Sequence, residues 1–218
     1  MSEANVFSIG LNAVIVAVTD ESPRVLTVRG AELSPVSESD ALALPSGPLD
    51  PERDRTLERG VRRWVREQTG LELGYVEQLY TFGDRHRDPI ERKGGPRVLS
   101  IAYVALVREG RLAGNSRAEW RDVYSFLPWE DWRQGRPTFI DSDILPRVQS
   151  WIDSHSEPYI RKGLRERAAI SFGLDGSGWD GEKVLERYEL LYEAGLAGEA
   201  DRDLPESVSL NWTQMPRL

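Results

Sequence analysis

Apolar positions along the first half of the chain follow strand patterns. Apolar runs at 9–18 (IGLNAVIVAV) and 24–30 (RVLTVRG) flank the turn residues DESP and predict a β-hairpin. Strand patterns recur at 73–82, at 97–109 and at the start of 119–132, whereas 31–54 is rich in Ser, Pro, Asp and Gly and is predicted to be mostly loop. The first half therefore predicts a sheet.

Helical spacing appears between these strands and then dominates the second half. From Arg55 to Thr69 the residues of one face are Leu57, Val61, Trp64, Val65 and Gln68, and Gly70 is placed to end the helix. Further helices are predicted at 143–155, 159–174 and 182–194, and the tail from 201 is expected to lack regular structure. The change of pattern predicts two domains, 1–155 with α/β (α+β) character and 156–218 as a helical region.

Composition narrows the chemistry of any site. The 218 residues include no Cys and two His, so thiolate chemistry and a His-rich metal site are excluded. A metal would have to bind carboxylates, as Mg²⁺ or Mn²⁺ does. The sequence has no membrane-length apolar run and no signal-peptide pattern, and we expect a cytoplasmic protein.

The net charge of the chain excludes fewer classes of partner than the composition excludes kinds of site. The net charge of −8 argues against a protein that coats nucleic acid indiscriminately, because phosphate binding depends on Lys and Arg. Two segments, 159–167 (YIRKGLRER) and 85–97, are nevertheless locally basic. A local basic face for a charged partner therefore stays open.

LPSG followed by RRWVREQTGL resembles the Nudix signature G-x5-E-x7-R-E-U-x-E-E-x-G-U, in which U is aliphatic. The resemblance places Arg63 at the arginine position and Glu67 at one of the glutamates that hold Mg²⁺ against a diphosphate. Trp64 and Gln68 replace the other two glutamates, so the box is degenerate and efficient hydrolysis is not expected.

The loop before this helix also departs from the signature. Gly47 lies two residues too early to be the opening glycine, which indicates an insertion. No residue clearly matches the loop glutamate, although Glu52 and Glu58 lie near its position.

A second resemblance is carried by the stretch QLYTFGDRHRDP and the strand RVLSIAYVALV that follows it. This stretch resembles a branch of the Nudix superfamily that contains ADP-ribose-linked enzymes and transcriptional regulators of NAD metabolism. The resemblance covers roughly residues 10–152. It implies a Nudix fold, with a mixed β-sheet sandwiched between helices, that senses ADP-ribose or a related metabolite.

Residues at the end of the 73–82 strand suit such a ligand. Arg85 and Arg87 can pair with a diphosphate, because guanidinium groups match phosphate oxygens. Arg63 of the box is a further candidate for ligand binding. Asp84 or Asp88 can accept hydrogen bonds from ribose hydroxyls, and Tyr80 or Phe82 can stack on adenine. The alternatives are that Phe82 packs in the core and that DRHRD is a solvated turn with His86 on the surface.

The resemblance also implies a winged-helix-like DNA-binding region after the Nudix domain. Arg161, Lys162, Arg165 and Arg167 are spaced to form a basic face. The 182–194 helix is acidic, however, and no basic recognition helix follows it. The chain is then a shortened regulator, a paralogue without DNA binding, or a protein that contacts DNA through the 159–170 helix alone; a helical dimerisation segment is the further alternative.

Two functions from different classes remain. The first is a ligand-sensing transcriptional regulator of NAD metabolism with little or no hydrolysis, with weak or absent Mg²⁺ binding. The second is a divergent Mg-dependent Nudix pyrophosphohydrolase, in which Glu67 would be the catalytic metal ligand. A structural interaction module is a third, weaker reading. The family and the seven Trp residues predict a homodimer.

Overall fold

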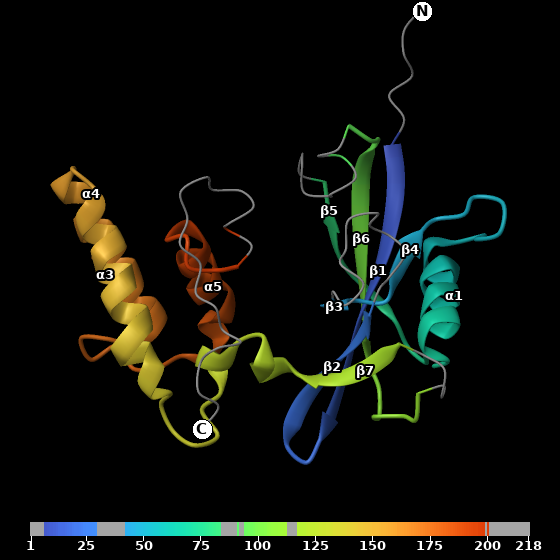
Figure 1. Cartoon of the computed structure of the whole chain (residues 1–218), viewed down its shortest axis with the longest axis horizontal. Helices are drawn as coiled ribbons and strands as arrows, with labels where there is room; N and C mark the ends of the chain where they lie inside the picture. The colour runs from blue at the N-terminus through green and yellow to red at the C-terminus, as the bar shows by residue number, and fades with distance from the viewer. Residues whose placement is uncertain are drawn as a thin grey trace, which may run out of the picture. The chain divides into compact units, whose positions relative to one another are not determined.

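The computed structural model describes residues 7–29, 42–83, 91, 94–112, 117–198 and 200, and the chain divides between Val123 and Tyr124 into two compact units (Figure 1). The first unit contains β1 (Phe7–Thr19), β2 (Ser22–Arg29), β3 (Leu42–Ala43), β4 (Ser46–Pro48), α1 (Leu57–Thr69), β5 (Glu77–Phe82), β6 (Arg97–Leu106) and β7 (Ala118–Asp122).

The strands of the first unit form one mixed, seven-stranded sheet with the order β3-β2-β1-β6-β5. β1 and β6 run parallel from Phe7↔Arg97 to Val16↔Leu106, and the other pairs are antiparallel. The long β1 pairs first with β4 and then with β2 along its other edge, while β7 pairs with β2. β5 is therefore an edge strand beside β6.

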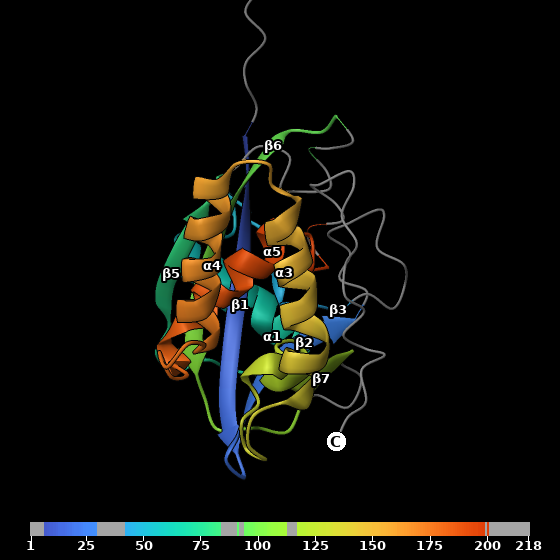
Figure 2. The ribbon, with the colours of Figure 1, turned by 90° about the vertical axis from the view of Figure 1, so that its left-hand side faces the viewer.

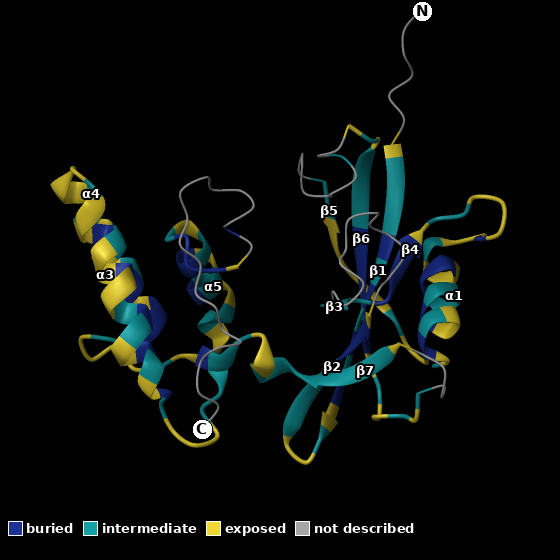
Figure 3. Ribbon diagram, viewed as in Figure 1, coloured by how far each residue is buried: buried dark blue, intermediate teal, exposed yellow. Residues whose placement is uncertain are grey.

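The core of the first unit lies between the sheet and α1. Leu11, Ala13 and Ile15 alternate along β1 and are at most 2% exposed, as a strand with one buried face requires. They pack with Val61 and Val65 of α1, and the dark side of α1 in Figure 3 marks the same contact. The other face of the sheet carries the alternate residues.

The predicted hairpin is confirmed and its turn is tight. β1 and β2 are antiparallel, and Thr19 pairs with Ser22, which leaves Asp20 and Glu21 as a two-residue loop. Both loop residues have positive φ, 49° and 59°. This matches the mirror-image turns that fit the right-handed twist of strands.

The second unit is helical. The 3-10 helix η1 (Val123–Ser125) spans the boundary. The second unit contains the 3-10 helices η2 (Pro128–Glu130) and η4 (Gly181–Lys183), the π-helix η3 (Ile140–Ile144), and the α-helices α3 (Leu145–Ser154), α4 (Pro158–Phe172) and α5 (Val184–Glu193). α3 and α4 lie against each other (Figure 2). The core of the second unit contains Trp129, Ile144, Ile152, Phe172 and Leu190.

A buried ion pair joins three elements of the second unit and the segment before η4. Arg187 of α5 is 0% exposed and forms two hydrogen bonds of 2.7 Å with the carboxylate of Glu130. It also donates to the carbonyl oxygens of Ser171 and Asp180, at 2.9 and 2.8 Å, and its guanidinium carbon lies 3.8 Å from the ring centre of Trp179. The pair fixes η2, α4 and α5 to one another with its charges satisfied.

The mixed α/β class is confirmed, and α1, α3, α4 and α5 occur where helical spacing predicts them. The structure differs in the predicted loop 31–54, which contains β3 and β4, and at 73–76, which precede β5 rather than belong to it. The tail from 201 lies outside the described residues. The functional division into 1–155 and 156–218 stays a prediction. No helix in the described ranges has the length and apolar character needed to span a membrane.

Candidate functional site

Hydrogen bonds and backbone geometry at both ends define α1, the helix that carries the residues resembling the Nudix signature. The Thr56 hydroxyl accepts a hydrogen bond from the Arg59 amide at 3.2 Å, and Gly70 ends the helix in the left-handed conformation with φ of 76°. A Cβ on Gly60 would lie 2.5 Å from Leu11, so α1 packs closely on β1 at this point. The polar side chains of α1 therefore occupy a fixed position above the sheet.

Arg63 is held by a carboxylate that the sequence pattern missed. Its Nε and one Nη donate to Asp54 at 2.8 and 2.7 Å, and the two side chains are 11% and 3% exposed. The hydrogen bond from Arg63 lowers the pKa of Asp54 against the opposing effect of burial, and it raises the pKa of Arg63. The signature spacing places the loop glutamate at position 55, so Asp54 lies one residue before it; the insertion in the loop and the shorter acid hid this match.

Glu67 is the carboxylate of the box that stays accessible. Its side chain is 42% exposed, and its Oε2 lies 3.5 Å from a guanidinium nitrogen of Arg63. In the part of the chain that the structure describes, no group of three His, Cys, Asp or Glu lies close enough to hold a metal ion.

Trp64 and Gln68, at the other two glutamate positions, bind the backbone of β4. The Gln68 amide accepts from the Ser46 N–H at 3.0 Å and donates to the Ser46 carbonyl at 2.8 Å. The Trp64 indole N–H donates to the Pro48 carbonyl at 2.9 Å. Both side chains therefore have structural partners at positions where the signature has metal ligands.

Tyr80 and Phe82 lie on the face of the sheet opposite α1. They pair with Ala102 and Ser100 of β6, whereas the neighbouring Ile101 packs in the core beneath α1. A bulge between Gln78 and Tyr80 sets this register. The two rings meet edge to face at 4.8 Å, and Tyr80 is 61% exposed, so it is available for stacking.

Polar groups accompany the aromatic pair on this face. Asn12 of β1 donates to the Ser100 hydroxyl at 2.6 Å on this face, whereas Arg97, which is in step with Ile101 along β6, donates to the Gly83 carbonyl at the end of β5. Asp84, Arg85, Arg87 and Asp88, and also His86, lie outside the described residues. The predicted site residues thus lie on opposite faces of the sheet, with Arg63 and Glu67 on the side of α1 and Tyr80 and Phe82 on the other side. The ligand roles of all these residues stay predictions.

The predicted basic face of α4 has its charges spread among several partners. Arg161 donates to the carbonyls of His155 and Ser156 at 2.7 and 2.8 Å. Arg165 pairs with Asp153 at 2.6 Å, and Arg167 pairs with Glu193 of α5 at 2.6 Å. Lys162 lies 3.8 Å from Glu166 and has a side chain that is 80% exposed, so it is the most accessible of the four cations. DNA contacts by these residues stay a prediction.

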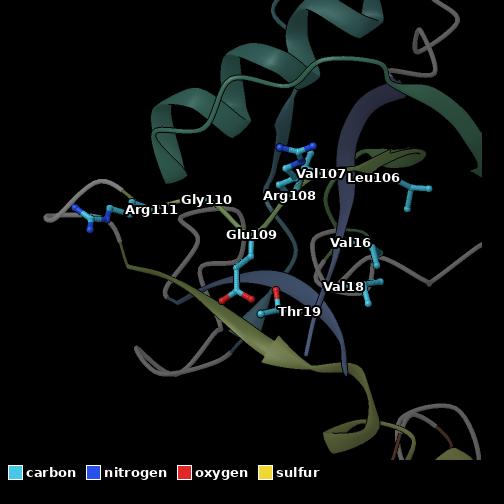
Figure 4. A pocket seen from close by; sticks show the side chains of 9 residues that line it. All are labelled: Val16, Val18, Thr19, Leu106, Val107, Arg108, Glu109, Gly110 and Arg111. Atoms are coloured by element: carbon cyan, nitrogen blue, oxygen red, sulfur yellow. The ribbon is translucent and has the colours of Figure 1, made fainter. Parts of the chain in front are cut away.

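A cavity of about 640 Å³ lies at the carboxyl ends of β1 and β6 (Figure 4). Val16, Val18 and Leu106 give it an apolar wall, and the segment 107–111 lines another part of it with residues that include Arg108, Glu109 and Arg111. None of the residues that the sequence predicts for a site lines this cavity.

Comparison with known proteins adds three relatives. The ADPR responsive transcriptional repressor NtrR of Acinetobacter baylyi is 30% identical over 82 residues, which cover 36% of this chain and 31% of the repressor. The NUDIX domain of Shewanella oneidensis NrtR, solved with ADP ribose, is 23% identical with a TM-score of 0.47 and covers 66% of this chain and 88% of that one. A MutT/nudix family protein from Enterococcus faecalis is 26% identical with a TM-score of 0.46, covering 56% and 46%.

The family itself is established by a longer match. The family model described as NUDIX domain matches residues 10–148, which include α1 and all of the sheet except the first three residues of β1. The chain therefore belongs to the Nudix family.

Proposed function

We propose that the protein is a Nudix-fold ligand sensor and transcriptional regulator of NAD metabolism, which binds ADP-ribose or a related nucleoside diphosphate with little or no hydrolysis. The observation that carries this proposal is the engagement of Trp64 and Gln68 with the backbone of β4. Two of the three glutamate positions of the box have neutral side chains with structural partners, which leaves Glu67 as the box carboxylate.

The donor set supports weak or absent use of a metal. Nudix proteins generally use a divalent metal such as Mg²⁺, which prefers several oxygen ligands in near-octahedral geometry. Indole cannot ligate Mg²⁺, and the Gln68 amide oxygen already accepts from Ser46. Among the described residues, the box does not fit a Mg²⁺–diphosphate site, and we assign no reaction step to a metal here.

The ligand proposal follows from the relative and from the sequence at the end of β5. The Acinetobacter baylyi relative is named an ADPR responsive repressor, which supports a sensor of the same ligand class. In this proposal Tyr80 stacks on adenine and Arg85 and Arg87 bind the diphosphate.

Because charge-assisted hydrogen bonds contribute about 1.5–3 kcal/mol, Arg87→Ala should weaken ADP-ribose binding by that amount in a calorimetric titration.

Glu67→Gln is the matched control for that titration. A sensor should retain nearly full ADP-ribose affinity in Glu67→Gln, since no binding step depends on a metal held there. An unchanged affinity in Arg87→Ala would contradict the assignment of the diphosphate site.

Binding to DNA and self-association complete the proposal. The basic residues of α4 (Arg161, Lys162, Arg165 and Arg167) would contact phosphates, and two copies of the chain would present two such helices. We expect a homodimer, and sedimentation equilibrium at micromolar concentration should give about twice the mass of 24.7 kDa. A single species of monomer mass would contradict this expectation.

The alternative is a divergent Nudix pyrophosphohydrolase, and the exposure of Glu67 beside Arg63 favours it. Titration of ADP-ribose with Mg²⁺ present, followed by assay of the same sample for AMP, distinguishes the two. Binding without AMP supports the sensor. AMP that disappears in Glu67→Gln supports the enzyme, and no binding at all would overturn both readings.

A further inference from the structure

The outer edge of β4 exposes three backbone groups that its sheet partner cannot satisfy. β4 pairs with β1 on one side only, and the bonds Ala13 N–H to Pro45 O and Leu49 N–H to Ile9 O, both 2.9 Å, point residues 45 and 49 toward β1. Because alternate residues of a strand point their backbone groups in opposite directions, Ser46 and Pro48 face away from β1. Pro48 has no N–H, so the outward groups are the Ser46 N–H, the Ser46 carbonyl and the Pro48 carbonyl.

Two side chains of α1 satisfy all three groups. Gln68 binds both groups of Ser46 with its amide, at 3.0 and 2.8 Å, in the way that a neighbouring strand would. The Trp64 indole N–H binds the Pro48 carbonyl at 2.9 Å. The two residues are four apart and therefore lie on one side of the helix, and their contacts cover the edge of β4 from end to end.

Gly47, between the two bonded residues, has a packing role in this arrangement. A Cβ built on Gly47 would lie 1.9 Å from Cε2 of Trp64, closer than any side chain permits. The indole therefore lies directly on the backbone of β4. A residue other than glycine at position 47 would push Trp64 away from Pro48.

We infer that Trp64 and Gln68 form a clasp that closes the outer edge of β4, and that this clasp and a metal site on the same side of α1 exclude each other. A glutamate at position 68 offers two acceptors and no donor, so it cannot bind the Ser46 carbonyl. A glutamate at position 64 has no donor for the Pro48 carbonyl. Carboxylates that could ligate a metal would thus leave the edge of β4 unsatisfied.

Hydrogen exchange of single amides tests the clasp. In Gln68→Met the Ser46 amide loses its acceptor, and its exchange should become about two- to tenfold faster, as expected for the loss of one neutral hydrogen bond. The Leu49 amide, which binds Ile9 on the inner edge, should change much less. Glu67→Met is the matched control on the same helix and should leave the Ser46 amide protected.

Unchanged protection of the Ser46 amide in Gln68→Met would overturn the clasp. The readout depends on neither ligand binding nor DNA binding, so failure of the clasp and failure of the proposed function are distinguishable.

Titration with a metal ion tests whether the clasp and a metal site on α1 exclude each other. Trp64→Glu/Gln68→Glu places carboxylates at 64, 67 and 68, and it should bind Mn²⁺ at least tenfold more tightly than the unaltered protein in calorimetry. Adding Glu67→Gln to this variant should remove most of that gain. Equal Mn²⁺ affinity in the unaltered protein, or tight Mn²⁺ binding with the Ser46 amide still protected, would contradict mutual exclusion. Gln68→Glu alone provides the same comparison if the double variant does not fold, with a smaller gain in affinity.

Discussion

At the scale of single residues, the pair of Asp54 and Arg63 fixes the start of the box helix. Both side chains are largely buried and meet through two hydrogen bonds. The pKa of Asp54 is lowered in the folded protein, chiefly by Arg63. A lowered pKa means that the pair stabilises the fold above the unfolded-state pKa of Asp, about 3.9. That stabilisation is lost as pH falls through the lower folded-state value.

Asp54→Asn should therefore destabilise the protein at pH 7 and reduce the loss of folding stability at acid pH. We expect a loss of about 3 kcal/mol, because removing one partner leaves the buried Arg63 without its main counter-charge. Thermal or urea unfolding should also show a smaller drop in stability below pH 4 than in the unaltered chain. Glu52→Gln, at an exposed carboxylate of the same loop, is the control. The same loss of folding stability below pH 4 in Asp54→Asn and in the unaltered protein would contradict this role.

The sequence predicted one partner of this pair and not the other. Arg63 follows from its spacing to Glu67 and Gly70 within a continuous helix, where every position is fixed by the helical repeat. Asp54 belongs to a loop with an insertion, and loop residues have no fixed spacing to the helix that follows. Only the fold shows that Asp54, rather than Glu52 or Glu58, reaches Arg63.

At the scale of elements, long periodic segments were predictable and short ones were not. The stripe of α1 and the alternation of β1 each span thirteen residues, so the pattern repeats several times. β4 is three residues long with the sequence SGP, which locally resembles a turn. Its pairing with β1 and its contacts with Trp64 and Gln68 are long-range, and no local pattern reports them.

The buried pair of Arg187 and Glu130 leads to a prediction about the second unit. Arg187→Met should lower the stability of this unit by about 3–5 kcal/mol, because Glu130 would stay buried without its partner. Adding Glu130→Leu should recover part of that loss, since no buried charge then remains unpaired. Urea unfolding of the single and double variants measures the coupling. Additive losses would mean that the two residues act independently.

At the scale of the whole molecule, the family was recognisable from the sequence because the box and the segment 78–89 are both contiguous motifs. The candidate site was less predictable. The bulge in β5 and the clasp on β4 each depend on contacts between segments far apart in sequence. The ligand-binding residues from Asp84 to Asp88 and the basic residues of α4 remain predictions of the sequence.

Salt dependence can test whether α4 contacts DNA. If Lys162 and Arg165 each bind a phosphate of B-form DNA, then each change to Gln should reduce the slope of log affinity against log salt by about 0.9. Fluorescence anisotropy with a labelled duplex at several salt concentrations measures this slope. Arg161→Gln is a useful comparison, because Arg161 already binds the carbonyls of His155 and Ser156. Slopes that stay unchanged in both Lys162→Gln and Arg165→Gln would exclude α4 from the DNA contact.

The bulge in β5 has a consequence for the comparison of related sequences. Leu79 is the extra residue between the pairs Gln78↔Tyr103 and Tyr80↔Ala102. If Leu79 paired with Ala102 in a regular ladder instead of bulging, Tyr80 would pair with Ile101 and point toward α1, and Thr81 would take the opposite face. A relative that keeps a residue at position 79 but lacks the bulge can therefore keep the letters Y-T-F and still present no aromatic surface to a nucleotide. Deletion of Leu79 would instead leave Tyr80 opposite Ala102, so a single-residue gap at this place in an alignment is compatible with an unchanged aromatic face.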